Sequence, residues 1–134
     1  MFPTISIPKL HNEYQLWMRE LIFYKEEIKI FERHLEDVIT KNNEQAVAAQ
    51  VEQFQNQFIR EKEVIDELKH KLNSSEKQLA DFVKEISGLG LESIKMDNHP
   101  NLREDMKTFR NIFNDLKTNF KKFDKRCISN CHDR

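Results

Sequence analysis

Apolar residues recur along almost the whole chain at spacings that alternate between four and three. The first series starts at Leu10 and keeps this rhythm to Val38 without a break. Such a heptad rhythm places every member of the series on one side of an α-helix, at the positions lettered a and d. We call each such series a seam. The first seam consists of Leu10, Tyr14, Trp17, Leu21, Tyr24, Ile28, Phe31, Leu35 and Val38.

Two further seams follow. The second consists of Val47, Val51, Phe54, Phe58, Glu61, Ile65, Leu68, Leu72, Ser75, Leu79, Phe82 and Ile86. The third consists of Leu102, Met106, Phe109, Phe113, Leu116, Phe120, Phe123 and Cys127. The phase of the second seam holds across Asn73–Ser75, which favours one helix, with a bend there as the alternative that would give a four-helix appearance. The seams predict helices over about 10–41, 44–87 and 100–127, after an extended arm over 1–9.

The scarcity of turn-forming residues supports this interpretation. The 134 residues include only two glycines and three prolines, and Gly88 and Gly90 stand together just after the second seam, where they end the helix. The sequence therefore predicts an all-α fold, an up-down-up bundle of three long antiparallel helices in a single domain over 1–134.

Charge and hydropathy exclude several classes of function. The 22 basic and 23 acidic residues leave a net charge of -1, which argues against a nucleic-acid partner. No apolar run approaches the roughly 20 residues that a membrane span needs. Because the first ten residues lack the basic start and apolar core of a secretory signal, we expect a cytoplasmic protein.

Helix lengths predict an uncovered tip where the first two helices meet. If the third helix starts beside the end of the second, it lies too low to cover that tip. The seam residues left without a third wall are Ile28, Phe31, Leu35, Val38, Val47, Val51 and Phe54. Monomers seldom expose so large an apolar patch, so we expect a homodimer in which two tips pair. In the alternative, the third helix slides upward and closes a three-helix monomer.

Acidic residues form a stripe beside the first seam. Glu13, Glu20 and Glu27 occupy successive g positions, and the third helix carries a matching basic stripe at e, which consists of Arg103, Arg110 and Lys117. Pairing between g and e positions is the usual way in which such stripes set helix packing. In the low register of the third helix, Glu13 would lie nearest Lys117 and the stripes could not pair fully.

Glu61 stands at a d position of the second seam, where an apolar residue is usual. We expect it to join a buried polar network formed by Glu20, Glu27, His34, Gln57 and Glu61. The network has two interpretations: it fixes the register of the helices, or Glu20, Glu27, His34 and Glu61 hold a metal ion or small ligand. The one Glu-x-x-His pair, Glu67 and His70, falls at solvent-facing positions, so we expect no metal and no cofactor.

No motif indicates catalysis. Cys127, Cys131 and His132 are too few for a structural zinc site, and the two glycines form no phosphate-binding loop. We therefore expect no enzyme, but a non-enzymatic helical interaction or scaffold protein that self-associates through its tip. The alternative is a metal- or small-ligand-binding bundle.

Several stretches resemble an uncharacterised family of small bacterial helical-bundle proteins. These stretches are Leu10–Glu13, Trp17–Leu21, Val51–Ile59 and Ile65–His70. The resemblance covers most of the chain, from Leu10 to about Phe123. It implies a bacterial, cytosolic, all-helical protein and brings no known activity or ligand.

Overall fold

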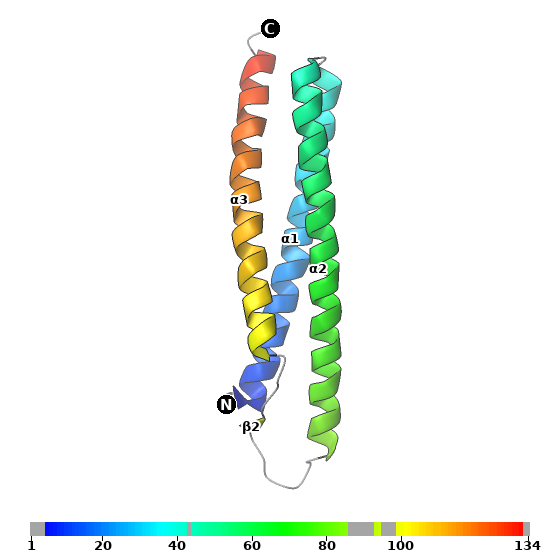
Figure 1. Cartoon of the computed structure of the whole chain (residues 1–134), viewed down its shortest axis with the longest axis vertical. Helices are drawn as coiled ribbons and strands as arrows, with labels where there is room; N and C mark the ends of the chain where they lie inside the picture. Colours follow the sequence, from blue (N-terminus) through cyan, green and yellow to red (C-terminus); the bar gives the residue numbers. More distant parts are fainter. Residues whose placement is uncertain (1–4, 43, 86–92, 95–98, 133–134) are drawn as a thin grey trace.

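Three long helices make up nearly all of the structure, a computed structural model that describes residues 5–42, 44–85, 93–94 and 99–132. They are α1 (Ile7–Lys41), α2 (Gln45–Glu85) and α3 (His99–His132). Two short strands, β1 (Ile5–Ser6) and β2 (Ser93–Ile94), pair antiparallel. α1 and α3 run in the same direction and α2 runs against them (Figure 1). The predicted all-α bundle of three helices is confirmed.

α1 begins earlier than expected. The Ser6 hydroxyl accepts a hydrogen bond from the backbone N–H of Lys9 at 3.2 Å, so Ser6 is the N-cap. Pro8 lies in the first turn, where a missing N–H costs no helical hydrogen bond. The predicted arm over 1–9 is therefore wrong from Ile7 onward, and residues 1–4 lie outside the described ranges. The helix ends at Lys41, and the C-cap residue Asn42 donates its backbone N–H to the Val38 carbonyl oxygen at 3.0 Å.

α2 runs without interruption through Asn73–Ser75, as the phase of its seam predicts. Ser75 is fully buried at its d position, where its small side chain fits between helices. The helix is described to Glu85; Ile86, Ser87 and the two glycines lie outside the described residues. No helix in the described ranges is long and apolar enough to cross a membrane.

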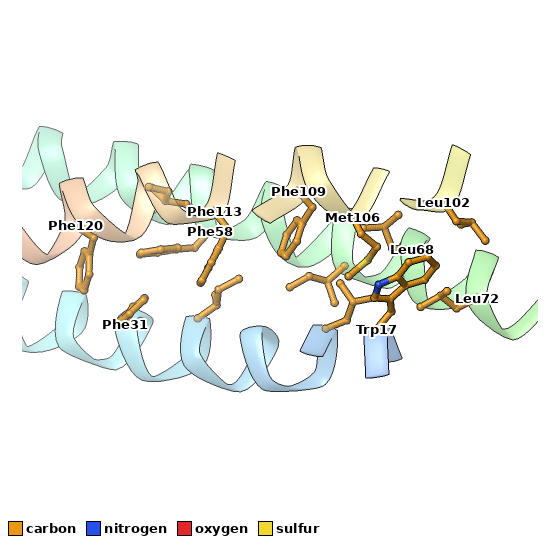
Figure 2. Close-up of a cluster of buried hydrophobic side chains, with 14 of the residues drawn as sticks. Trp17, Phe31, Phe58, Leu68, Leu72, Leu102, Met106, Phe109, Phe113 and Phe120 are labelled. Atoms are coloured by element: carbon orange, nitrogen blue, oxygen red, sulfur yellow. The ribbon is translucent and has the colours of Figure 1, made fainter. Parts of the chain in front are cut away.

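The seams meet in one core along the bundle axis. In Figure 2, aromatic rings of all three helices point into the space between them, Phe31 and Phe120 among them. Nearly all described seam side chains are buried; those that are only partly buried are Tyr24, Val47, Phe54 and Phe82. The side chain of Cys127 lies outside the described part of the structure.

The expected low position of the third helix is wrong. Phe120 of α3 lies 4.9 Å from Phe31 and 5.6 Å from Phe54, measured between ring centroids. Phe123 lies 5.2 Å from Phe54. α3 thus reaches the tip of the α1–α2 hairpin and covers the seam residues that were expected to lie uncovered there. Of the seven residues expected to be uncovered, Val47 and Phe54 are partly buried and the other five are buried.

The β1–β2 pair explains this position. Ile5 pairs with Ile94 and Ser6 with Ser93, so the chain is back beside the start of α1 before α3 begins. The expectation assumed a short turn at the end of α2 instead. α1 has 35 residues and α3 has 34, so two parallel helices that start at one level also end at one level. Self-association stays a prediction, but its proposed surface is closed within the chain.

Replacing Phe120 tests whether α3 covers the tip. We expect Phe120→Ala to lower the free energy of unfolding by about 3–5 kcal/mol, because it leaves a cavity among Phe31, Phe54 and Phe58. The neighbouring exposed Lys121→Ala should change it by less than about 0.5 kcal/mol. Urea denaturation measures both. A loss below about 1 kcal/mol for Phe120→Ala would contradict the packing described.

Candidate functional site

Polar side chains line up where α1 packs beside α3. Because the two helices are parallel, each g position of α1 meets an e position of α3 once in every heptad. Three carboxylates and one histidine of α1 find partners in this way, each partner standing 90 positions later in the chain. We call these contacts the polar row. It consists of Glu13–Arg103, Glu20–Arg110, Glu27–Lys117 and His34–Asp124.

The row confirms the predicted pairing between the acidic and the basic stripes. It also shows that the expected register, with Glu13 nearest Lys117, is wrong by two heptads. All three carboxylates are paired because α3 starts level with α1. Arg103 donates three hydrogen bonds of 2.9–3.1 Å to the Glu13 carboxylate.

Glu20 and Arg110 form the central, half-buried pair of the row. Arg110 donates from Nε at 2.5 Å and from Nη2 at 2.8 Å to the two carboxylate oxygens, and Tyr24 donates its hydroxyl to Oε1 at 3.1 Å. The hydrogen bonds from Arg110 hold the pKa of Glu20 below its usual value, and Glu20 in turn raises the pKa of Arg110. Such a bidentate, charge-assisted contact fixes the relative orientation of the two side chains as well as the distance between them.

His99 closes the lower end of the row. It is only 7% exposed, and its ring stacks on Trp17 with centroids 5.6 Å apart. Its Nε2 lies 3.1 Å from Arg103 Nη2 and 3.3 Å from Glu13 Oε2. Burial lowers the pKa of His99, Arg103 lowers it further, and Glu13 opposes both. The imidazole is therefore held neutral.

His99 was not predicted as a site residue, because a residue just before a proline is typical of a loop. The heptad spacing of the third seam, however, does indicate that His99 is a core residue. His99 stands three positions before Leu102, so it continues the third seam backward to another core position.

Glu61 and Gln57 lie away from the polar row, at the groove between α2 and α3. Glu61 is only 6% exposed, whereas Gln57 is exposed at the rim of the groove. The expected network thus divides into two parts. Glu20, Glu27 and His34 each contact α3 in the polar row, while Gln57 and Glu61 line a different surface.

This division bears on the metal-site interpretation. Within the described ranges, no three side chains of histidine, cysteine, aspartate or glutamate come together in a way that could hold a metal ion. Glu20 and Glu27 use carboxylate oxygens to bind basic side chains of α3. Their geometry is that of a packing device.

Comparisons of the chain with protein-family models, with curated proteins and with solved structures found no match. The resemblance to small bacterial helical-bundle proteins therefore stays a prediction, and function must be inferred from the geometry of the chain itself.

The Glu20–Arg110 contact should be worth more than an exposed ion pair. A double-mutant cycle of Glu20→Ala and Arg110→Ala should give a coupling free energy of about 1–2 kcal/mol, because both groups are half-buried and two hydrogen bonds join them. The matched cycle uses Glu26 and Lys29, an exposed pair 3.2 Å apart on α1, and should give below about 0.5 kcal/mol. Equal couplings, measured by urea denaturation, would contradict this ranking.

Stability should fall as the pH drops below about 6.5, the ordinary pKa of histidine. His99 has a lowered pKa in the folded protein, so the unfolded chain takes up a proton in this range before the folded protein does. His99→Gln should therefore lose less stability than the native chain between about pH 7.5 and 5.5. His70→Gln, an exposed position on α2, is the control and should keep the native slope. Thermal unfolding measures all three; a native slope in His99→Gln would refute the assignment.

Proposed function

We propose that the protein is a non-enzymatic interaction module that binds an acidic amphipathic helix of a partner protein along the outer side of α1. One observation carries the proposal. Leu16, Phe23 and Ile30 are 61%, 62% and 49% exposed, although all three are large and apolar. Their spacing of seven puts them in one line at the c position of α1, and we call this line the docking stripe.

The docking stripe runs beside the polar row. On a helix, c is the neighbour of g on the outer side, and the g positions of α1 face α3. The corresponding outer position on α3 is b, which holds Lys107, Asn114 and Lys121. A helix laid along the outside of the α1–α3 pair would therefore meet an apolar ridge on one side and a basic ridge on the other, the arrangement of helix-in-groove recognition.

The charges around the docking stripe favour an acidic partner. Its exposed basic residues are Arg19, Arg33, Lys107 and Lys121, and none of them forms an ion pair with another described residue. Glu26, which stands at the same heptad position midway between Arg19 and Arg33, is paired with Lys29. A second copy of the chain would bring the same basic residues to the interface, so like charges argue against self-association here.

The core and the polar row leave this surface free to bind. The seams pack and the row pairs inside the chain, and Leu16, Phe23 and Ile30 are not part of that core. That separation is what a scaffold requires. The alternative function, a bundle binding a metal or small ligand through Glu20, Glu27, His34 and Glu61, is less well supported because these side chains do not converge.

A synthetic peptide tests the proposal. The probe is a fluorescent amphipathic helix with leucines at heptad spacing and glutamates along both edges, and fluorescence anisotropy measures its binding. Phe23→Ser should weaken binding at least tenfold, because it removes the largest apolar contact of the stripe. Ile59→Ser, at an apolar position of α2 that is 47% exposed, should leave binding unchanged.

The charge of the probe provides the second comparison. A peptide with lysines in place of the glutamates should bind more weakly than the acidic peptide. Added salt should weaken the binding of the acidic peptide, because it screens the attraction between the charges. Equal binding of both peptides, or native binding by Phe23→Ser, would refute the proposal. Sedimentation of the chain alone gives a further check: a dimer that Phe23→Ser dissociates would assign the stripe to a second copy instead, and binding to anionic vesicles but not to the acidic peptide would assign it to a membrane surface.

A further inference from the structure

A groove runs between α2 and α3, on the side of α3 away from the polar row. Two adjoining hollows of about 330 Å³ and 270 Å³ make up the groove, and both are lined by Arg60, Glu61 and Ile112. Glu61 therefore stands at the middle of the groove. Both hollows are open to solvent, so a small ligand would lie along the groove and stay partly exposed.

Glu61 is a buried acid without a partner in the described part of the structure. It occupies a core position of α2 and the residue as a whole is 6% exposed, but its carboxylate oxygens open onto the groove, and no ion pair or hydrogen bond from another described residue engages them. The neighbouring Arg60 is exposed and stabilises the charged form only weakly, while burial raises the pKa of Glu61. A carboxylate at a heptad core position costs stability unless a partner or solvent in the groove compensates it. A residue retained for packing alone would be apolar here, as at most other positions of the seam.

The groove is both acidic and apolar. Its acidic side chains are those of Glu61, Glu67, Asp105 and Asp115. Its basic side chains are Arg60 and Lys71, and Lys71 already contacts Asp105 at 3.4 Å. Apolar walls come from Val64, Leu116 and the half-exposed Ile112. A positive charge with an apolar body matches both properties at once.

We propose that this groove binds a small amphipathic organic cation, whose protonated amino group pairs with the Glu61 carboxylate while its apolar body lies against Ile112 and Leu116. The site is separate from the docking stripe, because it lies between α2 and α3 and shares no residue with that stripe. A cation would supply a partner that no other described residue offers Glu61, and the amide oxygens of Gln57 and Asn119, which line the same hollow, would accept hydrogen bonds from its amino group.

Phenethylamine is the first probe, because it joins one ammonium group to one apolar ring. Titration by NMR should show saturable binding with a Kd of about 1 mM, a reasonable affinity for so small a ligand. Glu61→Gln should weaken binding about tenfold or more, because it removes the charge but keeps the shape. Glu63→Gln, at an exposed position of the same helix, is the matched control and should bind as the native chain does.

Two further measurements separate a ligand site from a merely structural acid. Phenylethanol, which has the same ring without the charge, should bind at least tenfold more weakly than phenethylamine. Phenethylamine should also lower the pKa of the Glu61 carboxyl group, followed by carbon-13 NMR, since the bound ammonium favours the charged form.

The proposal is overturned if Glu61→Gln binds phenethylamine as tightly as the native chain, or if saturating amine leaves the Glu61 pKa unchanged. Absence of saturable binding at about 20 mM amine, well above the expected Kd, would overturn it too. These outcomes would leave the proposal for the docking stripe unaffected, because its test uses α1 variants and a peptide probe.

Discussion

Parallel packing of α1 against α3 in one constant register is the constraint on which the rest of the structure depends. Apolar seams supply most of the driving force, but apolar contacts are not directional and tolerate a shift by one heptad. The polar row removes that freedom. Moving α3 by one heptad in one direction would bring Asp124 opposite Glu27, two carboxylates side by side. Moving it in the other direction would take Arg103 away from Glu13, and either change is costly.

The same register gives the two sides of α3 different characters. Toward α1, paired charges are bordered by an apolar ridge on α1 and basic residues on α3. Toward α2, the groove contains Glu61, a largely buried acid that no other described residue pairs with, among apolar walls. One helix thus separates the surface that we propose for an acidic helix from the groove that we propose for a small cation. The net charge of -1, a sum over the whole chain, does not reveal this division.

The fold was largely predictable because heptad spacing is a local property. Every described seam residue is at least partly buried, and α2 passes through Asn73–Ser75 as its phase predicted. The pairing of acidic and basic stripes was predictable for the same reason. The arrangement of the expected polar network was only partly predictable. Glu61 was correctly singled out as a polar residue in the seam, but its expected neighbours Glu20 and Glu27 face α3 in the polar row instead.

The sequence by itself determined which face of each helix is buried and which charges could meet, because heptad position follows from residue spacing alone. Only the tertiary structure decided how far along α1 the third helix begins. That level depends on the β1–β2 pair, a contact between residues almost 90 positions apart that no periodicity encodes. It closed the tip over Phe31 and Phe54, made Glu13 the partner of Arg103, and left Glu61 beside an open groove.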